Sequence, residues 1–232
     1  MKIKQFKYSS DNLGYLIYGA KTAMAIDGGA ADEMASFIEA QNLTLAFATH
    51  THTHPDHTSG TKRLVEKTGS RVVDHRVLMA EKTIDLDGGR VGVIHTPGHT
   101  DDSAVFFAEN FMVTGDTLFN GTIGNCFSGN LKQFYESIRS LMAFPGDTLI
   151  YAGHDYVEYS MAFAAIIEPD NPGIDRYLKK YDANRVRSTI NDELTANPYL
   201  RFNDKEMISV LKKQGRLHST EYERWESIMS IS

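Results

Sequence analysis

The chain has 232 residues, 41 % of them hydrophobic, and a formal net charge of -6. This size and composition allow a sizeable buried core in one large domain or in one domain with an appendage. The negative charge, without a long run of Lys or Arg, argues against a partner that is nucleic acid. The N-terminus alternates like a strand and lacks the apolar segment of a signal peptide or membrane span, so we expect a cytoplasmic protein without a membrane partner. A single cysteine, Cys126, excludes an internal disulfide and is consistent with a reducing compartment.

The first third of the chain has the pattern of strands alternating with helices. Apolar alternation between turn-forming segments predicts strands at residues 2–8, 13–18, 22–27, 43–48 and 71–74. Helical spacing of apolar residues predicts helices at residues 30–40 and 62–67.

The remainder divides into a mostly β segment and a helical tail. Strands are predicted at residues 84–86, 91–95, 104–108, 111–113 and 148–152, with an amphipathic helix at 131–144. After residue 154 the pattern is helical, at residues 156–167, 173–181, 204–213 and 219–229. We therefore expect an α/β catalytic domain at residues 1–165 and an all-helical tail at 166–232 that packs on it.

Thr-His-Thr-His-Pro-Asp-His, residues 51–57, follows an apolar strand and holds the densest group of potential metal ligands. Side chains two apart in an extended chain point the same way, so His52 and His54 can reach one ion. Asp56 and His57 come where the chain turns into a helix, so they face a neighbouring point. The spacing indicates two adjacent metal positions. His50 also stands two residues before His52, but the Asp-His pair sets the register and leaves His50 with a structural role.

Three later strands end at Gly next to a metal-binding side chain: His99 follows Gly98, Asp116 follows Gly115 and His154 follows Gly153. Together with the first cluster they make seven N/O groups, which suit zinc, iron or manganese and leave positions open for water. The other histidines, namely His75, His95 and His218, lack this context and are interpreted as surface or packing residues.

This ligand order resembles that of the metallo-β-lactamase superfamily, H-x-H-x-D-H followed by His, Asp and His. The resemblance implies an αββα sandwich with two divalent metal ions, zinc first and iron or manganese as alternatives. It implies the following ligands: His52, His54 and His99 for one ion, Asp56, His57 and His154 for the other, and Asp116 bridging them. Such a pair of ions activates water for attack on a carbonyl. Asp116 would orient that water, and Asp56 would balance charge as well as bind metal.

A closer resemblance, to the glyoxalase II or hydroxyacylglutathione hydrolase family, covers nearly the whole chain. Its motifs are Asp11-Asn12, Gly115-Asp116-Thr117-Leu118-Phe119, Gly153-His154-Asp155-Tyr156, Glu168-Pro169-Asp170-Asn171 and Asn197-Pro198-Tyr199-Leu200-Arg201. The resemblance implies hydrolysis of S-(2-hydroxyacyl)glutathione or a related thioester to a 2-hydroxy acid and free thiol, with the helical tail binding substrate. A thiolate leaving group, with a free pKa of ~8.5, needs no strong general acid.

The chain departs from this family in the segment that would contact the thiol carrier. Asn125 stands where the family usually has Lys or Arg, and Phe127 where Tyr is common. Tyr156 remains, and Arg201 and Lys205 are expected to meet a carrier carboxylate. Two alternatives stay open: a mononuclear iron persulfide dioxygenase, and a lactonase or lactamase on the same fold. The sequence does not determine the oligomeric state.

Overall fold

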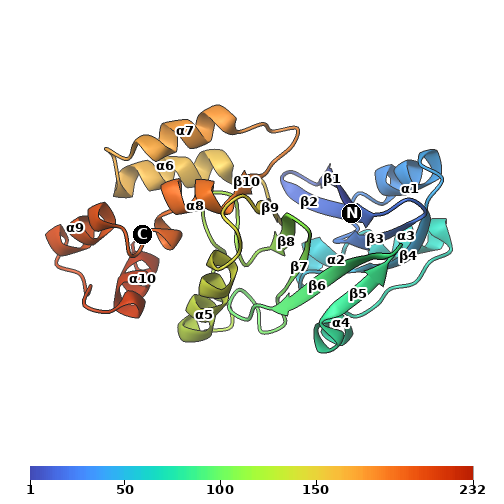
Figure 1. Cartoon of the computed structure of the whole chain (residues 1–232), viewed down its shortest axis with the longest axis horizontal. Helices are drawn as coiled ribbons and strands as arrows, with labels where there is room; N and C mark the ends of the chain where they lie inside the picture. Colours follow the sequence, from blue (N-terminus) through green and yellow to red (C-terminus); the bar gives the residue numbers. More distant parts are fainter. Residues whose placement is uncertain (232) are drawn as a thin grey trace.

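The structure is a computed structural model that describes residues 1–231. The first part of the chain forms a four-stranded sheet in the order β1-β2-β3-β4. Its strands are β1 (Lys2–Tyr8), β2 (Asn12–Tyr18), β3 (Thr22–Ile26) and β4 (Thr44–Thr49). Only β3 and β4 are parallel, and α1 (Ala31–Ala40) makes the crossover between them. Helix α1 and helix α3 (Thr61–Thr68) cover the outer face of this sheet (Figure 1).

The second sheet has the order β10-β9-β8-β7-β6-β5. Its strands are β5 (Thr83–Leu86), β6 (Gly89–His95), β7 (Ala104–Ala108), β8 (Phe111–Gly115), β9 (Leu149–Ala152) and β10 (Ser188–Thr189). Strands β8 and β9 are parallel, and α5 (Leu131–Met142) connects them. As in the first sheet, the parallel pair brings two strand ends to the same edge.

Apolar residues from the inner faces of both sheets form one core. Tyr15 and Met24 of the first sheet belong to the same buried cluster as Phe106 and Tyr151 of the second. Separate clusters lie between the first sheet and α1 and α3, and between the second sheet and α5. This confirms the predicted αββα sandwich.

The tail consists mainly of helices that lie beside the second sheet, at the left of Figure 1. They are α6 (Val157–Ile167), α7 (Pro172–Lys180), α8 (Ile190–Ala196), η1 (Pro198–Leu200), α9 (Lys205–Lys213) and α10 (Glu221–Met229). Trp225 of α10 is fully buried, with its ring 5.9 Å from that of Phe134 on α5. The tail therefore packs on the αββα sandwich. The division after residue 165 falls inside α6 and stays a prediction.

Two local expectations were wrong. Val72 makes only an isolated bridge, to Ala48, in place of the strand expected at residues 71–74. The side chain of Asp74 accepts a hydrogen bond from the backbone N–H of Arg76 and caps α4 (His75–Glu81), which we did not predict. The tail also contributes β10 to the sheet by pairing with β9, so it is not entirely helical.

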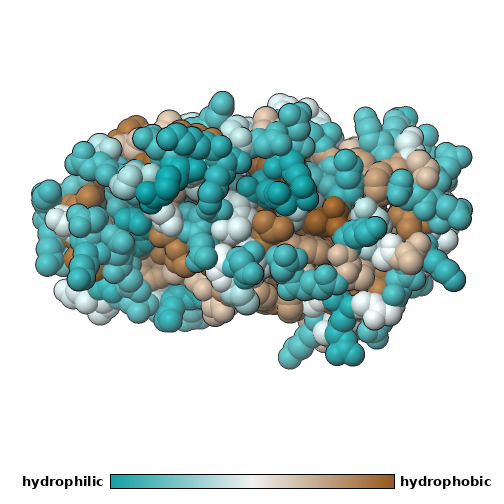
Figure 2. Space-filling model, turned by 45° about the horizontal axis from the view of Figure 1, so that its top comes forward, coloured by the Kyte–Doolittle hydropathy of each residue, from teal (hydrophilic) through white to brown (hydrophobic). Residues whose placement is uncertain are grey.

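Hydrophilic residues cover most of the face shown in Figure 2, and hydrophobic residues appear there in smaller groups. Within residues 1–231, no helix has the length and apolarity needed to cross a membrane.

Candidate metal centre

The seven predicted ligands come from four chain segments that meet at one edge of the sandwich. His52 and His54 lie in the loop after β4, and Asp56 and His57 lie on the short helix α2 (Pro55–Thr58). The turns that follow β6, β8 and β9 carry His99, Asp116 and His154, respectively. The structure therefore brings together side chains that are up to about one hundred residues apart in sequence.

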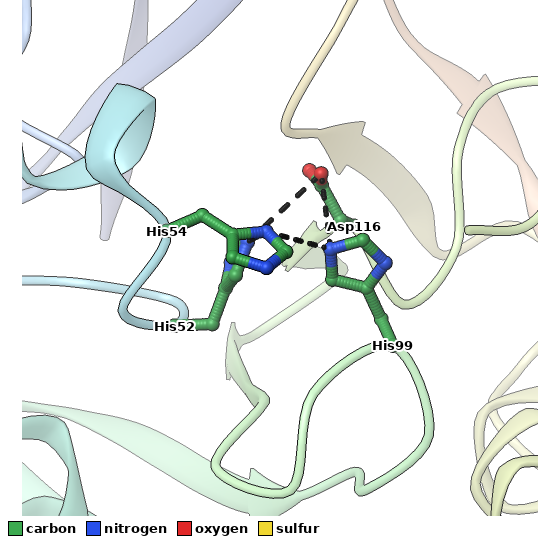
Figure 3. Close-up of side chains that lie close together, drawn as sticks. All are labelled: His52, His54, His99 and Asp116. Atoms are coloured by element: carbon green, nitrogen blue, oxygen red, sulfur yellow. Dashed lines mark hydrogen bonds and ion pairs between the residues drawn. The ribbon is translucent and has the colours of Figure 1, made fainter. Parts of the chain in front are cut away.

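The first group consists of three histidines and one carboxylate, all pointing toward one another (Figure 3). His54 Nδ1 lies 2.9 Å from His52 Nε2 and 3.1 Å from His99 Nε2. Asp116 Oδ2 lies 3.5 Å from His99 Nε2 and 4.0 Å from His52 Nε2. These four donors surround one point.

The second group, Asp56, His57 and His154, lies directly beside the first. His57 Nε2 is 3.2 Å from His154 Nε2, and Asp56 Oδ2 is 3.5 Å and 3.3 Å from these two nitrogens. Asp116 reaches this group as well, with Oδ1 3.3 Å from His57 Nε2 and Oδ2 3.5 Å from His154 Nε2. Its carboxylate thus lies between the two groups.

The residues fit divalent metal ions. Nitrogen ligands at about 2.0–2.1 Å from a tetrahedral ion lie ~3.3 Å from each other, close to the separations seen here. Within the described residues, the buried Oδ1 of Asp116 makes no hydrogen bond of normal geometry, although His57 Nε2 is near. Lone pairs directed at a common point, with a buried oxygen that has no donor, are the arrangement that a bound cation satisfies.

The ring nitrogens that face away from the centre are held by neighbouring groups. The pairs are His52 Nδ1 with Thr51 Oγ1 (3.1 Å), His57 Nδ1 with Asp27 Oδ2 (2.9 Å), His99 Nδ1 with the Asn125 carbonyl (3.0 Å), and His154 Nδ1 with Asp11 Oδ1 (2.7 Å). Such contacts orient a metal-binding imidazole and set its tautomer. The acceptors on His57, His99 and His154 leave each Nε2 available to a metal.

Charge at the centre also favours cations. Burial opposes ionisation of Asp116, but the adjacent imidazoles of His154 and His57 hold the pKa of its carboxyl well below the usual range. Burial likewise opposes protonation of His57, yet the carboxylates of Asp27 and Asp116 raise its pKa to about 11, so a metal ion would have to displace a proton from its Nε2. His52 differs, because burial lowers its pKa to about 3 and keeps the imidazole neutral. The site therefore offers carboxylate charge and a neutral nitrogen donor to a positive ion.

Sequence reasoning missed Asp27, which is fully buried directly after β3. Its carboxylate accepts hydrogen bonds from the N–H and hydroxyl of Thr51, besides its contact with His57. The signal was present, since Asp27 ends a strand next to Gly28 as Asp116 does next to Gly115. Asn12 was also missed as a site residue: its Nδ2 donates to Asp56 Oδ2 at 2.9 Å.

Close backbone approach explains glycine at two positions. A Cβ on Gly153 would lie 2.1 Å from Asp116 Oδ1, and one on Gly124 would lie 2.0 Å from the carbonyl oxygen of Asp116. Both contacts are sterically impossible, so any larger residue there would displace the carboxylate or its loop.

Three of the five predicted substrate contacts lie at this centre. The Phe127 side chain is 65 % exposed, and its ring lies 5.7 Å from the His54 ring and 5.2 Å from the His99 ring. Tyr156 stacks on His154 with a centroid separation of 5.0 Å. Asn125 contributes its carbonyl to His99 while its side chain is exposed.

The structure does not bring the other two predicted contacts into the ligand cluster. Arg201 is 9 % exposed, and its guanidinium donates to both carboxylate oxygens of Glu168 at 2.8 and 3.0 Å. It also pairs with Asp204 and donates to the Thr195 carbonyl. Lys205 is exposed at the start of α9. The interpretation of either residue as a carrier contact stays a prediction.

The remaining histidines have other partners. His50 Nε2 lies 3.0 Å from Thr61 Oγ1, the buried His75 lies 3.3 Å from Asp102, and the exposed His95 contacts the carbonyl of Asp101. Within residues 1–231, neither metal-binding group includes them.

Comparison with known proteins agrees with this geometry. Residues 80–154 match the family model for the metallo-beta-lactamase superfamily. The crystal structure of ETHE1 from Myxococcus xanthus superposes with a TM-score of 0.67 at 25 % identity, covering 99 % of this chain and 90 % of that one. The BLEG-1 B3 metallo-beta-lactamase superposes with a TM-score of 0.64 at 19 % identity, covering 86 % and 99 %. The fold is that of the metallo-β-lactamase superfamily.

The sequence of the tail identifies one family within this superfamily. Residues 155–228 match the model for the C-terminus of hydroxyacylglutathione hydrolase. Curated proteins of that name are 35 % identical in Chromohalobacter salexigens, covering 82 % of each chain, and 32 % identical in Pseudoalteromonas translucida, covering 100 % of this chain and 97 % of the relative. A third, from Brucella ovis, is 34 % identical over 88 % of each chain. The chain belongs to the hydroxyacylglutathione hydrolase family, as its motifs predicted.

Proposed function

We propose that this chain is a binuclear metallohydrolase that cleaves S-(2-hydroxyacyl)glutathione-type thioesters to a 2-hydroxy acid and a free thiol. The observation that carries the proposal is the convergence of seven ligands into two adjacent groups that share Asp116. Family membership supplies the substrate class, because the relatives are named hydroxyacylglutathione hydrolase.

The ligand assignment is part of this proposal. His52, His54 and His99 would hold one divalent ion, Asp56, His57 and His154 would hold the second, and Asp116 lies where it could contribute to both groups. Zinc is the first choice, because imidazole and carboxylate donors at these separations suit tetrahedral coordination. Iron and manganese are accepted by the same donors, and metal supply decides between them.

Two bound ions would supply activated water and polarise a carbonyl oxygen. The protein's own contribution is orientation. The ionised carboxylate of Asp116, held between the two groups, accepts a hydrogen bond from the attacking water and directs it. Asp56 balances positive charge, and the amide of Asn12 fixes its carboxylate. The departing thiol has a pKa of ~8.5 and leaves as a thiolate, so no strong general acid is required.

The thiol carrier is proposed to lie along the wall formed by Asn125 and Phe127, with Tyr156 at the opposite group. The exposed Phe127 ring offers an apolar surface beside His54 and His99. Glutathione or a related thiol is the proposed carrier. The expected cytoplasmic location stays a prediction.

Two observations count against the alternatives. The relatives that are 32–35 % identical over most of the chain are named hydroxyacylglutathione hydrolase, which favours the hydrolase over a mononuclear dioxygenase. A lactonase does not require the helical tail, whose residues 155–228 match the family of thioester hydrolases.

The test is metal analysis of the purified protein together with assays on an S-(2-hydroxyacyl)glutathione and, in parallel, a lactone. We expect two ions per chain and faster turnover of the thioester. A fully loaded sample with one ion per chain and no thioester hydrolysis would refute the proposal. Preferential lactone turnover would assign the centre to the lactonase class.

A further inference from the structure

The buried carboxylate of Glu193 on α8 has no role in the mechanism described so far. It is 0 % exposed, and within residues 1–231 it forms no ion pair. Four donors hold it: Tyr177 Oη (2.5 Å), Ser188 Oγ (2.5 Å), Asn197 Nδ2 (2.8 Å) and the backbone N–H of Gly121 (2.9 Å). A buried carboxylate is costly without such bonds, so this arrangement needs a reason.

The Glu193 network ties three consecutive residues of the catalytic part to the tail. Gly121 donates its N–H to Glu193 itself. Asn120 Nδ2 donates to Ser188 Oγ at 2.7 Å, and Asn197 Nδ2 donates to the carbonyl of Thr122 at 3.2 Å. Both partners, Ser188 and Asn197, also donate to the Glu193 carboxylate. The hydrogen bonds between the tail and residues 120–122 therefore all involve Glu193 or a residue that donates to its carboxylate.

On its N-terminal side, the 120–122 turn is linked through Phe119 to His154 of the second ligand group. The turn is closed by the bridge between Leu118 and Ile123 and by the Phe119 N–H, which donates to the Thr122 carbonyl at 3.0 Å. The Phe119 ring meets the His154 ring at 5.9 Å and the Tyr156 ring at 5.1 Å, both edge to face. A shift of the turn would move this contact.

On its C-terminal side, the 120–122 turn is followed by residues 124–127, which contact Asp116 and His99 of the first ligand group. Gly124 lies against the backbone of Asp116, the carbonyl of Asn125 accepts from His99 Nδ1, and the Phe127 ring lies 5.2 Å from the His99 ring. The 120–122 turn thus precedes, within a few residues, the whole wall proposed to contact the carrier.

We propose that Glu193 is a positioning residue for the proposed thioester hydrolysis: its carboxylate fixes the 120–122 turn and, through it, Phe119 and the carrier wall formed by Asn125 and Phe127. The kinetic part of this inference, the expected change in KM, rests on the proposed function. Because Asn125 and Phe127 are proposed to contact the carrier and not the reacting carbonyl, a loosened wall is expected to raise KM more than it lowers kcat.

The ionised form is the one that this network requires, since all four partners donate. Burial raises the pKa of Glu193 to about 7. On α7, Tyr177 contacts it and has a pKa far above neutrality, and Lys180 pairs with Asp192, the acidic neighbour of Glu193 on α8. Ser188 of β10, Asn197 and the 120–122 turn present uncharged groups. Protonation of Glu193 at low pH then removes an acceptor and loosens the turn.

The first experiment compares Glu193→Gln with Asp192→Asn in the full-length, metal-loaded protein. Asp192 is adjacent, but its carboxylate contacts Thr189 and Lys180, not the turn. At pH 8 we expect Glu193→Gln to raise KM about ten-fold with kcat within about two-fold, and Asp192→Asn to leave KM unchanged. The KM ratio of Glu193→Gln to wild type should fall toward one at pH 5.5, where the wild-type residue is itself neutral. Ionisations common to both proteins cancel in this ratio.

A second readout is independent of activity. Cys126 is the only cysteine and lies in the wall segment, so its rate of reaction with a thiol reagent reports the mobility of that segment. We expect about ten-fold faster labelling in Glu193→Gln and no change in Asp192→Asn, with metal content retained in both. Inactive wild type would refute the proposed function, while the labelling would still test the positioning.

Equal KM ratios at pH 5.5 and 8, or equal labelling in the two variants, would overturn the inference. Should Glu193→Gln fail to fold, Tyr177→Phe provides the test, because it removes one donor and keeps the carboxylate. Loss of that donor disfavours the ionised form, so the rise of KM on acidification should begin at higher pH than in wild type. An unshifted profile would again overturn it.

Discussion

Asn125→Lys introduces, in the proposed carrier wall, the positive charge that the resemblance to the family led us to expect there. The side chain of Asn125 is exposed while its carbonyl holds His99, so lysine can extend into solvent without disturbing the metal centre. A charge-assisted hydrogen bond to a carboxylate contributes ~1.5–3 kcal/mol, and exposure places this one at or below the lower end. About 1.4 kcal/mol corresponds to a ten-fold change in affinity. The contact lies away from the scissile carbonyl, so it should lower KM and leave kcat nearly unchanged.

The assay is steady-state hydrolysis of a glutathione thioester at low and high salt. We expect KM to fall roughly ten-fold at low salt and less at high salt, because salt screens an exposed charge. Asn184→Lys is the matched control, since it adds the same charge at an exposed loop position whose side chain contacts Asp182. An unchanged KM for Asn125→Lys would refute the reasoning, and so would an equal decrease in both variants. In either case the carrier is held by other residues or is a different thiol.

Three further outcomes are expected. His50→Ala should retain metal and most activity while His54→Ala loses both, and equal damage would mean that the wrong H-x-H pair was chosen. Asp27→Asn should weaken the second metal position by about 10- to 100-fold in chelator competition, because the amide cannot accept all three of the donors that the carboxylate accepts. Equal weakening of both positions would contradict this. Arg201→Met should lower the free energy of unfolding by about 3–5 kcal/mol in denaturant titration, because it leaves the buried Glu168 unpaired. Recovery in the double variant with Glu168→Leu would identify the pair as the cause.

The candidate ligands could be singled out from the sequence because their spacing and turn context are local. His52, His54 and Asp56-His57 lie within six residues, and His99, Asp116 and His154 each follow a Gly at a strand end. Backbone alternation and turn chemistry determine these directions before any tertiary contact forms. The same holds for most strands and helices, whose apolar periodicity matched the observed elements. It failed at residues 71–74, where two valines indicated a strand but the capping Asp74 begins a helix.

The partners of these residues were decided only by tertiary structure. Asp27 reaches His57 because β3 and β4 lie side by side in parallel, and no local sequence pattern predicts that pairing. The ion pair of Arg201 was likewise invisible in the sequence, because packing of the tail is what places Glu168 against its guanidinium. Its role as a carrier contact stays a prediction. Glu193 is the clearest example of a residue whose surroundings the sequence did not predict. A carboxylate in a polar helix reads as solvent-exposed from sequence, and only the fold reveals that it is buried beneath the turn leading to the metal centre.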